Sequence, residues 1–270
     1  MPQQITILGL GWLGLPLAKV LFEKGYEITG STRSAKKSMR LLRSNYTIKI
    51  IKASKNTVEG NWKNFIEGTD VLVINLPPDS KNNNEGYYPM VIDQISQRCD
   101  PETKVVFISS TSVYGDTNEI VTEETLPQPS KKSGSAVLSA EKVIVDYFGR
   151  NATILRFAGL CGEDRHPVRS ISGNRLKNPS GKINLIHLND CISLITGVIE
   201  KNHFGDVING CADEHPTRED FYTKACFDLG IEQPYFEAAR QENWKIVSNE
   251  KSKRIFGINY LNPNDFLTQP

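Results

Sequence analysis

The chain has 270 residues, of which 39% are hydrophobic and 23% charged, and its formal net charge is +1. This composition is typical of a globular protein with a sizeable core, built as one large α/β domain or as one domain with a small lobe. A charge so close to neutral argues against a general nucleic-acid or membrane-surface binder, and no apolar run reaches membrane-spanning length. We therefore predict no nucleic-acid partner and no membrane.

The cysteines and histidines show no metal-binding pattern. The five cysteines are scattered without a C-x-x-C pair, and the four histidines lack metal-ligand spacing. The N-terminus enters a strand within a few residues of Met1 and has no signal-peptide layout. We therefore expect no metal, buried thiols without disulfides, and a cytoplasmic location.

Residues 4–25 read QITILGLGWLGLPLAKVLFEKG and predict a dinucleotide-binding unit. An apolar strand at Ile5–Leu8 leads into Gly9, Gly11 and Gly14, spaced G-x-G-x-x-G, and a helical pattern follows. Gly9 permits a tight turn, Gly11 lets backbone approach a pyrophosphate, and Gly14 allows close helix–sheet packing. The helix N-terminus then directs N–H groups and a positive dipole end at the phosphates. A glycine-rich turn in another kind of α/β unit is the alternative, and the strand and helix on either side argue against it.

The second strand is predicted at Tyr26–Gly30, and no acidic residue stands at its end. In NAD-selective sites an Asp or Glu at this place binds the ribose 2′-OH. Here the strand is followed by Ser31, Thr32 and Arg33, and an arginine at this place accommodates a 2′-phosphate. We therefore predict NADP(H) in preference to NAD(H). The alternative is that the cations of residues 33–37 only form the solvated face of the next helix.

Strand and helix patterns alternate along the rest of the chain. Strands are predicted at 46–51, 70–76, 104–109, 153–157, 182–187 and 207–209, and helices at 87–99, 135–148, 191–200 and 217–230. Asp190 and Thr217 are placed to cap the last two helices. This alternation predicts an α/β, Rossmann-like, doubly wound parallel sheet with right-handed crossovers. Residues 1–160 would form the dinucleotide-binding core, and residues 161–270 the remaining core strands interleaved with a small C-terminal substrate lobe.

Three later segments carry a family resemblance. FISSTSVYGD at 107–116, ILRFAGLCGEDR at 154–165 and INLIHLNDC at 183–191 resemble, in order, motifs of the extended short-chain dehydrogenases, the NAD(P)-dependent epimerase and dehydratase group. The opening GLGWLGLPLA and the later NLPP also resemble the β-hydroxyacid dehydrogenases. Those enzymes continue with an all-helical domain, however, whereas strand patterns here recur to about residue 209. The tail KIVSNEKSKRIFGI resembles the end of a bacterial branch of atypical members that keep G-x-G-x-x-G.

The resemblance implies where the cofactor lies. The glycine loop would hold the pyrophosphate, residues 75–77 would flank the adenine-ribose, and residues 157–160 would flank the nicotinamide. Trp12 would cover the pyrophosphate or only pack in the helix turn. The predicted cofactor-binding residues are Gly9, Gly11, Trp12, Leu13, Gly14, Ser31, Thr32, Arg33, Asn75, Leu76, Pro77, Ser109, Phe157, Ala158, Gly159 and Leu160.

The catalytic Y-x-x-x-K pair of the resembled family is missing. Alignment on the Ala-Glu at 140–141 puts Ser133 at the tyrosine position and Val137 at the lysine position. A serine hydroxyl is too weak an acid to replace a phenol, and valine has no group to donate. Ser110 matches the catalytic Ser/Thr of the family and can orient a carbonyl.

Other groups near these motifs have two interpretations each. Tyr114 is either a substitute acid/base or the ordinary V-Y-G tyrosine at the pocket wall, and the two lysines at 131–132 approach the same space from another direction. Cys161 is a nucleophile or a small residue in a turn, and the absence of a His/Asn partner favours the turn. Residues 165–166 (Arg-His) meet an anionic substrate or are merely solvated, and His187 is a core histidine with its hydrogen bonds satisfied.

Two functions follow from these residues and the resemblance. The first is an NADP(H)-dependent oxidoreductase or epimerase-like enzyme acting on a small polar or nucleotide-sugar substrate, with Ser110 and Tyr114 as candidate catalytic residues. The second is a catalytically silent NADP(H)-binding sensor or partner-binding protein, which the missing Tyr and Lys favour. Members of the resembled family often dimerise, so a homodimer is a further expectation.

Overall fold

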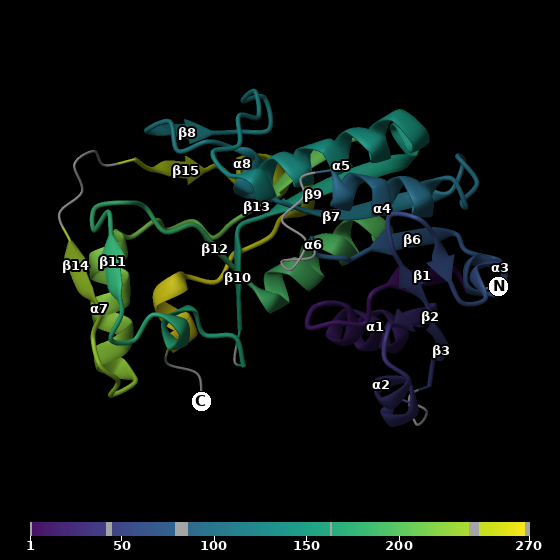
Figure 1. The fold of residues 1–270 in the computed structure, drawn as a ribbon, viewed down its shortest axis with the longest axis horizontal. Coiled ribbons are helices and arrows are strands. Elements are labelled where there is room, and N and C mark those ends of the chain that lie inside the picture. The colour runs from purple at the N-terminus through teal and green to yellow at the C-terminus, as the bar shows by residue number, and fades with distance from the viewer. Residues whose placement is uncertain (1, 42–44, 79–85, 163, 238–242, 268–270) are drawn as a thin grey trace. The chain divides into compact units, whose positions relative to one another are not determined.

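The predicted sheet is the main feature of the computed structural model, which describes residues 2–41, 45–78, 86–162, 164–237 and 243–267 (Figure 1). Seven strands form it in the order β13-β9-β7-β6-β1-β2-β3. Strand β1 pairs in parallel with β2 and β6, and the next pairs on either side, β2–β3 and β6–β7, are parallel as well. The bounds in chain order are β1 Gln4–Leu8, β2 Glu27–Thr32, β3 Thr47–Ile50, β6 Val71–Ile74, β7 Lys104–Ser110, β9 Ala152–Phe157 and β13 Val207–Gly210. The predicted α/β fold with a doubly wound parallel sheet is confirmed.

The helices explain why the central strands are apolar on both faces. All four residues of β6 are fully buried, as expected for a parallel strand covered on both sides. Helices α4 and α5 run alongside one another on one side of the sheet, and α1 lies on the other (Figure 1). The helix bounds are α1 Gly14–Glu23, α2 Ala35–Arg40, α3 Trp62–Ile66, α4 Tyr87–Ser96, α5 Lys132–Phe148, α6 Leu188–Glu200, α7 Arg218–Asp228 and α8 Glu250–Phe256.

A buried ion pair joins α5 to two strands of the sheet. Glu141 of α5 accepts hydrogen bonds from Arg156 of β9, at 2.7 Å from Nη2 and 3.0 Å from Nε. The same carboxylate accepts a hydrogen bond from the hydroxyl of Ser109 in β7. All three residues are buried. Because a buried charge is tolerated only when it is paired and hydrogen-bonded, this cluster fixes the position of α5 on β7 and β9.

The chain divides into two compact units and passes between them repeatedly. The first unit comprises Met1–Val113, Pro129–Arg156 and Ile195–Val207, and the second comprises the remaining stretches, Tyr114–Gln128, Phe157–Leu194 and Ile208–Pro270. The antiparallel hairpin of β4 (Lys52–Ala53) and β5 (Val58–Glu59) belongs to the first unit.

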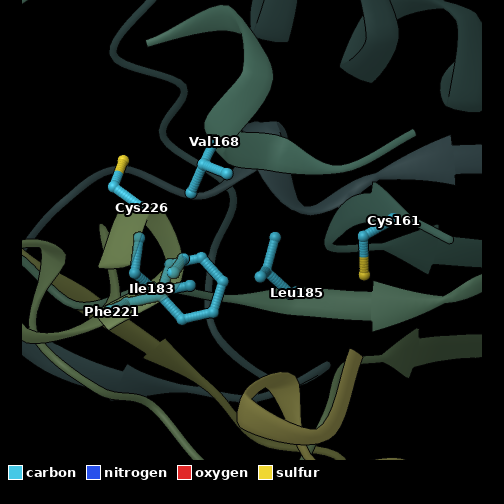
Figure 2. Packing of buried hydrophobic residues seen from close by; sticks show 7 residues of the cluster. Cys161, Val168, Ile183, Leu185, Phe221 and Cys226 are labelled. Atoms are coloured by element: carbon cyan, nitrogen blue, oxygen red, sulfur yellow. The ribbon is translucent and has the colours of Figure 1, made fainter. Parts of the chain in front are cut away.

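Short strand pairs and a hydrophobic cluster build the second unit. Three parallel pairs occur in it: β10 (Gly159–Cys161) with β12 (Leu185–His187), β11 (Arg175–Lys177) with β14 (Tyr235–Glu237), and β8 (Glu119–Val121) with β15 (Lys245–Val247). Figure 2 shows its cluster of buried side chains, which consists of Cys161, Val168, Ile183, Leu185, Phe221, Ala225 and Cys226. Burial of these apolar side chains stabilises an arrangement that three-residue strands cannot hold alone.

The five cysteines are all buried and carry free thiols. Among the described residues, no group of three or more His, Cys, Asp or Glu side chains is arranged to hold a metal ion. Within the same residues, no helix combines the length and the apolar character needed to cross a membrane.

Several predicted boundaries differ from the structure. The second strand, predicted at Tyr26–Gly30, runs from Glu27 to Thr32, so Ser31 and Thr32 belong to β2 instead of following it. Helix α5 begins at Lys132, three residues before its predicted start, and the predicted strand at 182–187 is reduced to Leu185–His187. The predicted cap by Asp190 is wrong, because α6 already begins at Leu188.

Different side chains cap α6 and α7. The His187 Nδ1 accepts the N–H of Asn189 at 3.2 Å, while the Asp190 carboxylate accepts the N–H of Leu261 at 3.0 Å. The predicted cap by Thr217 is confirmed, since its hydroxyl accepts the N–H of Asp220 at 3.1 Å.

Candidate functional site

The glycine loop between β1 and α1 is shaped by contacts that only glycine allows. Gly9 has a φ of +111°, and a Cβ on it would lie 2.5 Å from the carbonyl oxygen of Asn75. A Cβ on Gly14 would lie 2.1 Å from the carbonyl oxygen of Gly9. A Cβ on Gly11 would meet nothing within 4 Å, so this residue faces open space. These are the turn, the close packing and the open approach that the G-x-G-x-x-G spacing predicts.

Neighbouring strands hold the loop by hydrogen bonds to Gly9. Its N–H donates to the hydroxyl of Ser31 at the end of β2, at 3.0 Å. Its carbonyl accepts from the side-chain amide of Asn75, just after β6, at 3.1 Å. The loop is therefore tied to the strands on both sides of β1.

A cavity of about 480 Å³ opens at the carboxyl ends of β1, β2 and β6. This is the edge of an open parallel sheet at which ligands bind, and the volume lies within the range of small-molecule and cofactor sites. Its walls come from the glycine loop, the end of β2, the start of α2, the segment after β3, the end of β6 and α4. The lining residues are Leu8, Gly9, Leu10, Gly11, Ser31, Thr32, Arg33, Ser34, Lys37, Ile51, Ala53, Asn75, Leu76, Pro77, Pro78, Tyr87, Tyr88 and Val91.

The charged residues on the cavity wall, among the residues the structure describes, are Arg33 and Lys37, and no Asp or Glu lines it. Arg33 is exposed and Lys37 is half-buried. Ser34 caps the short helix α2, its hydroxyl accepting the N–H of Lys37 at 3.2 Å. Two cations without a carboxylate make this end of the cavity attractive to an anion.

Tyr88 of α4 fixes another part of the cavity wall. Its hydroxyl donates to the carbonyl of Leu76 at 2.7 Å, which holds the segment leaving β6. Burial raises the pKa of the Tyr88 phenol well above its usual value, so the hydroxyl stays protonated and remains a donor.

The structure brings half of the predicted cofactor residues together on this cavity. They are Gly9, Gly11, Ser31, Thr32, Arg33, Asn75, Leu76 and Pro77. Trp12, Leu13 and Gly14 continue the loop into α1 without lining the cavity, and Ser109 is instead bonded to Glu141. Residues 157–160 belong to the second unit, where Phe157 and Ala158 are buried and Gly159 is exposed.

The first turn of α5 lies where the resemblance puts the missing pair. A Cβ on Gly134 would lie 2.3 Å from the carbonyl oxygen of Ser112, so α5 touches the backbone just after β7. The Ser110 hydroxyl accepts the N–H of Ser112 at 3.1 Å in the same stretch. Ser133 is exposed beside this contact, and Val137 is buried one turn farther along. Neither residue offers a group that titrates near neutral pH.

Tyr114 lies in the second unit and is 1% exposed. Its hydroxyl donates to Oδ1 of Asn209 at 3.0 Å, so it is hydrogen-bonded within the second unit. The Sγ of Cys161 donates to the carbonyl of Ile186, and burial raises the pKa of this thiol, so it is not a ready nucleophile.

The remaining charged candidates are on the surface or locally bonded. Both lysines at 131–132 are exposed, and so is Arg165. The His166 Nδ1 accepts the N–H of Val168 at 3.2 Å, as a cap of the following turn.

Several wall residues are not expected from the sequence patterns, among them Ser34, Ile51, Ala53, Tyr87, Tyr88 and Val91. Ser34 had a readable signal, because a serine just before a helix is a preferred cap. The others are apolar or aromatic residues on separate elements, and only the packing of those elements brings them to the cavity.

Comparisons with known proteins agree with this architecture. The model of the NAD dependent epimerase/dehydratase family matches residues 5–190. Protein YeeZ from Escherichia coli (strain K12) is 31% identical over 271 residues, which are 98% of each chain. A functionally unknown conserved protein from Silicibacter pomeroyi DSS has a TM-score of 0.79 at 24% identity, over 98% of this chain and 97% of that one. UDP-glucuronic acid 4-epimerase from Bacillus cereus, solved in complex with NAD, has a TM-score of 0.79 at 20% identity, over 98% and 96%. The chain therefore belongs to the NAD dependent epimerase/dehydratase family.

Proposed function

We propose that this chain binds NADP(H) in the cavity of the first unit and acts as an oxidoreductase or epimerase-like enzyme on a nucleotide sugar or another small polar substrate. The observation that carries the cofactor part is the cavity wall itself. It combines an open glycine loop at a helix N-terminus with Arg33 and Lys37, and it lacks any acidic side chain among the described residues. A nicotinamide dinucleotide with a 2′-phosphate matches both features.

Particular residues would hold each part of the cofactor. The loop at 9–14 would bind the pyrophosphate, Arg33 and Lys37 the 2′-phosphate, and residues 75–77 the adenine-ribose. When bound, the nicotinamide accepts or donates a hydride, and the protein supplies orientation and a proton source. Ser110 would orient the reacting carbonyl or hydroxyl of the substrate.

A solved structure of similar fold suggests the substrate class. The solved relative from Bacillus cereus is a UDP-glucuronic acid 4-epimerase, which favours a nucleotide sugar here. A cytoplasmic location and a homodimer complete the proposal, and both come from the sequence analysis.

Fluorescence titration of the purified chain with NADPH and NADH tests the cofactor. We expect NADPH to bind at least tenfold more tightly, since an ion pair with a phosphate contributes a factor of this order. Arg33→Ala should weaken NADPH about tenfold and leave NADH within twofold. Lys36→Ala is the matched control, because Lys36 is on α2 and exposed but does not line the cavity. Equal affinity of the wild-type chain for NADPH and NADH would contradict the assignment of Arg33.

The second candidate is an NADP(H)-binding protein without turnover. Ser133 and Val137 in place of Tyr and Lys favour it, and so does the engagement of the Tyr114 hydroxyl by Asn209. NADPH oxidation measured against panels of carbonyl compounds and nucleotide sugars separates the two. Turnover that Ser110→Ala abolishes supports the enzyme, whereas tight NADPH binding with no turnover on any panel supports the silent protein.

A further inference from the structure

The peptide groups of Gly9 are held from both sides by buried or half-buried side chains. Its N–H donates to Ser31 Oγ at 3.0 Å, and its carbonyl accepts from Asn75 Nδ2 at 3.1 Å and from the N–H of Gly11 at 2.8 Å. Gly9 is the residue with positive φ at which the chain turns out of β1. The orientation of its two peptide planes therefore decides where the following N–H groups point.

Strand β2 makes further contacts with the loop besides the hydrogen bond to the Ser31 hydroxyl. The Ser31 carbonyl accepts the N–H of Leu10 at 2.7 Å, so this one residue bonds two successive residues of the loop. The side chain of Leu10 packs on Gly30, where a Cβ would lie 2.5 Å from Leu10 Cδ1. Gly30 and Ser31 together therefore hold the loop against the end of β2.

The hydroxyls at the end of β2 are already engaged within the protein. Ser31 is 2% exposed and accepts from Gly9, while Thr32 is 8% exposed and its Oγ1 accepts the N–H of Ser34 at 3.2 Å. Arg33, the next residue, is exposed. The sequence pattern alone suggests that Ser31, Thr32 and Arg33 would all meet a 2′-phosphate. In the structure both hydroxyls accept a backbone N–H, whereas Arg33 is exposed on the cavity wall.

We propose that Ser31 and Asn75 are positioning residues that fix the peptide groups of Gly9 and thereby aim the glycine loop at the cofactor pyrophosphate. This rests on the proposed NADP(H) binding and assigns the parts of that site. Ser31 and Asn75 govern affinity for any dinucleotide, whereas Arg33 and Lys37 govern the choice of NADPH over NADH.

The physical reason is the cost of an unpartnered amide. Without the Ser31 hydroxyl, the N–H of Gly9 loses its acceptor in a part-buried place, and the loop relaxes to find another. A relaxed loop must be reordered before it binds a pyrophosphate. We expect the removal of one Gly9 hydrogen bond to weaken dinucleotide binding about tenfold for this reason. A ligand that never touches the loop is unaffected.

Three probes separate positioning from direct contact: NADPH, NADH and adenosine 2′-monophosphate, which carries the adenine and the 2′-phosphate but no pyrophosphate. For Ser31→Ala we expect NADPH and NADH to weaken by the same factor, about tenfold, and the monophosphate to stay within twofold. Ser31→Thr keeps the hydroxyl and should restore dinucleotide binding to within about threefold. Thr29→Val is the matched control. It also removes a hydroxyl from β2, but this hydroxyl accepts a hydrogen bond from the Gln4 side chain and does not line the cavity.

Asn75→Ala provides an independent test of the positioning role. It should also weaken NADPH and NADH equally, and the double variant should lose less than the product of the two single losses, because both side chains act on Gly9. If thermal melting shows that Ser31→Ala does not fold, Asn75→Ala is measured in its place. The test is then whether its affinities for NADPH and NADH fall by the same factor.

Several outcomes would overturn the assignment while leaving the proposed function in place. Loss of NADPH and the monophosphate with NADH unchanged would make Ser31 a direct phosphate ligand. Equal loss of all three probes would indicate general damage to the fold, and no loss would show that the Gly9 bonds are dispensable. If the wild-type chain bound neither dinucleotide, the proposed function itself would fail.

Discussion

Asp190 is the residue whose burial has the clearest consequence for stability. It is 5% exposed in α6 and accepts the N–H of Leu261, which ties the C-terminal segment to this helix. Removal of its carboxyl group from water raises its pKa from 3.8 to about 6, although hydrogen bonds from the backbone oppose that rise. The folded protein therefore holds this proton more tightly than the unfolded chain does.

The sign of the pH dependence follows from that difference. Because the folded pKa is the higher one, the contribution of Asp190 to stability is fully present below about pH 4 and is lost as pH rises through about 6. A pKa difference of this size corresponds to about 3 kcal/mol. We expect the free energy of unfolding of wild type, relative to Asp190→Asn, to fall by that order between pH 4 and pH 7 in urea titrations.

Asp146→Asn is the control for the loss of one negative charge, since Asp146 is exposed on α5. A constant difference between wild type and Asp190→Asn across this pH range would contradict the role of burial at Asp190.

At the scale of elements, the attachment of α5 to β7 and β9 depends on one carboxylate. Glu141→Gln removes the charge that pairs with Arg156 and leaves a buried guanidinium without its counter-ion. Breaking a buried pair on one side costs about 3–5 kcal/mol, so we expect a loss of that size in urea unfolding.

The double variant Glu141→Gln/Arg156→Met is the matched comparison for this pair. It removes both charges, so it should recover much of the stability that Glu141→Gln loses. A loss below about 1 kcal/mol in the single variant would mean that solvent reaches Arg156.

The sequence predicted the sheet well and the small elements poorly, for physical reasons. Strands such as Val71–Ile74 are buried apolar runs, and that pattern alone identifies them. The start of α5 was missed because Lys-Lys-Ser-Gly has the composition of a loop. In the structure Gly134 belongs to the helix, and its missing side chain allows α5 to contact the backbone of Ser112. The pairs β11–β14 and β8–β15 join three-residue strands far apart in sequence, and no local pattern marks them.

In the candidate site, too, local features can be predicted from the sequence and contacts between distant elements cannot. The glycine spacing by itself identifies the loop, because the steric need for glycine is local. The bond from Ser31 to Gly9 and the bond from Tyr88 to Leu76 depend on how strands and helices meet. These two contacts join residues far apart in the sequence, and no local sequence pattern marks them.

At the scale of the whole molecule, the two units are interleaved along the chain. Residues 195–207 belong to the first unit, although residues 157–194, which precede them in the chain, belong to the second. That late segment supplies Glu200, which bonds Lys24 at 2.8 Å, and the carbonyl of Asp206, which accepts the N–H of Ile154.

A fragment of residues 1–160, cut at the boundary that the sequence suggested, therefore lacks part of its own sheet. We expect this fragment to show no cooperative thermal transition, whereas the full chain shows one. Circular dichroism melting of both tests it, with the full chain carried through the same purification as the control. A sharp transition in the fragment would show that residues 195–207 are dispensable.

The burial of all five thiols makes the chain a convenient scaffold for site-specific labels. A maleimide dye needs an accessible sulfur, and in the native state none of the chain's own cysteines presents one. A single cysteine introduced at an exposed place, such as Lys36 beside the cavity, would then take up the dye alone, with every natural cysteine left where it is. A chain labelled in this way would serve the proposed NADPH and NADH titrations with the rest of its sequence unaltered.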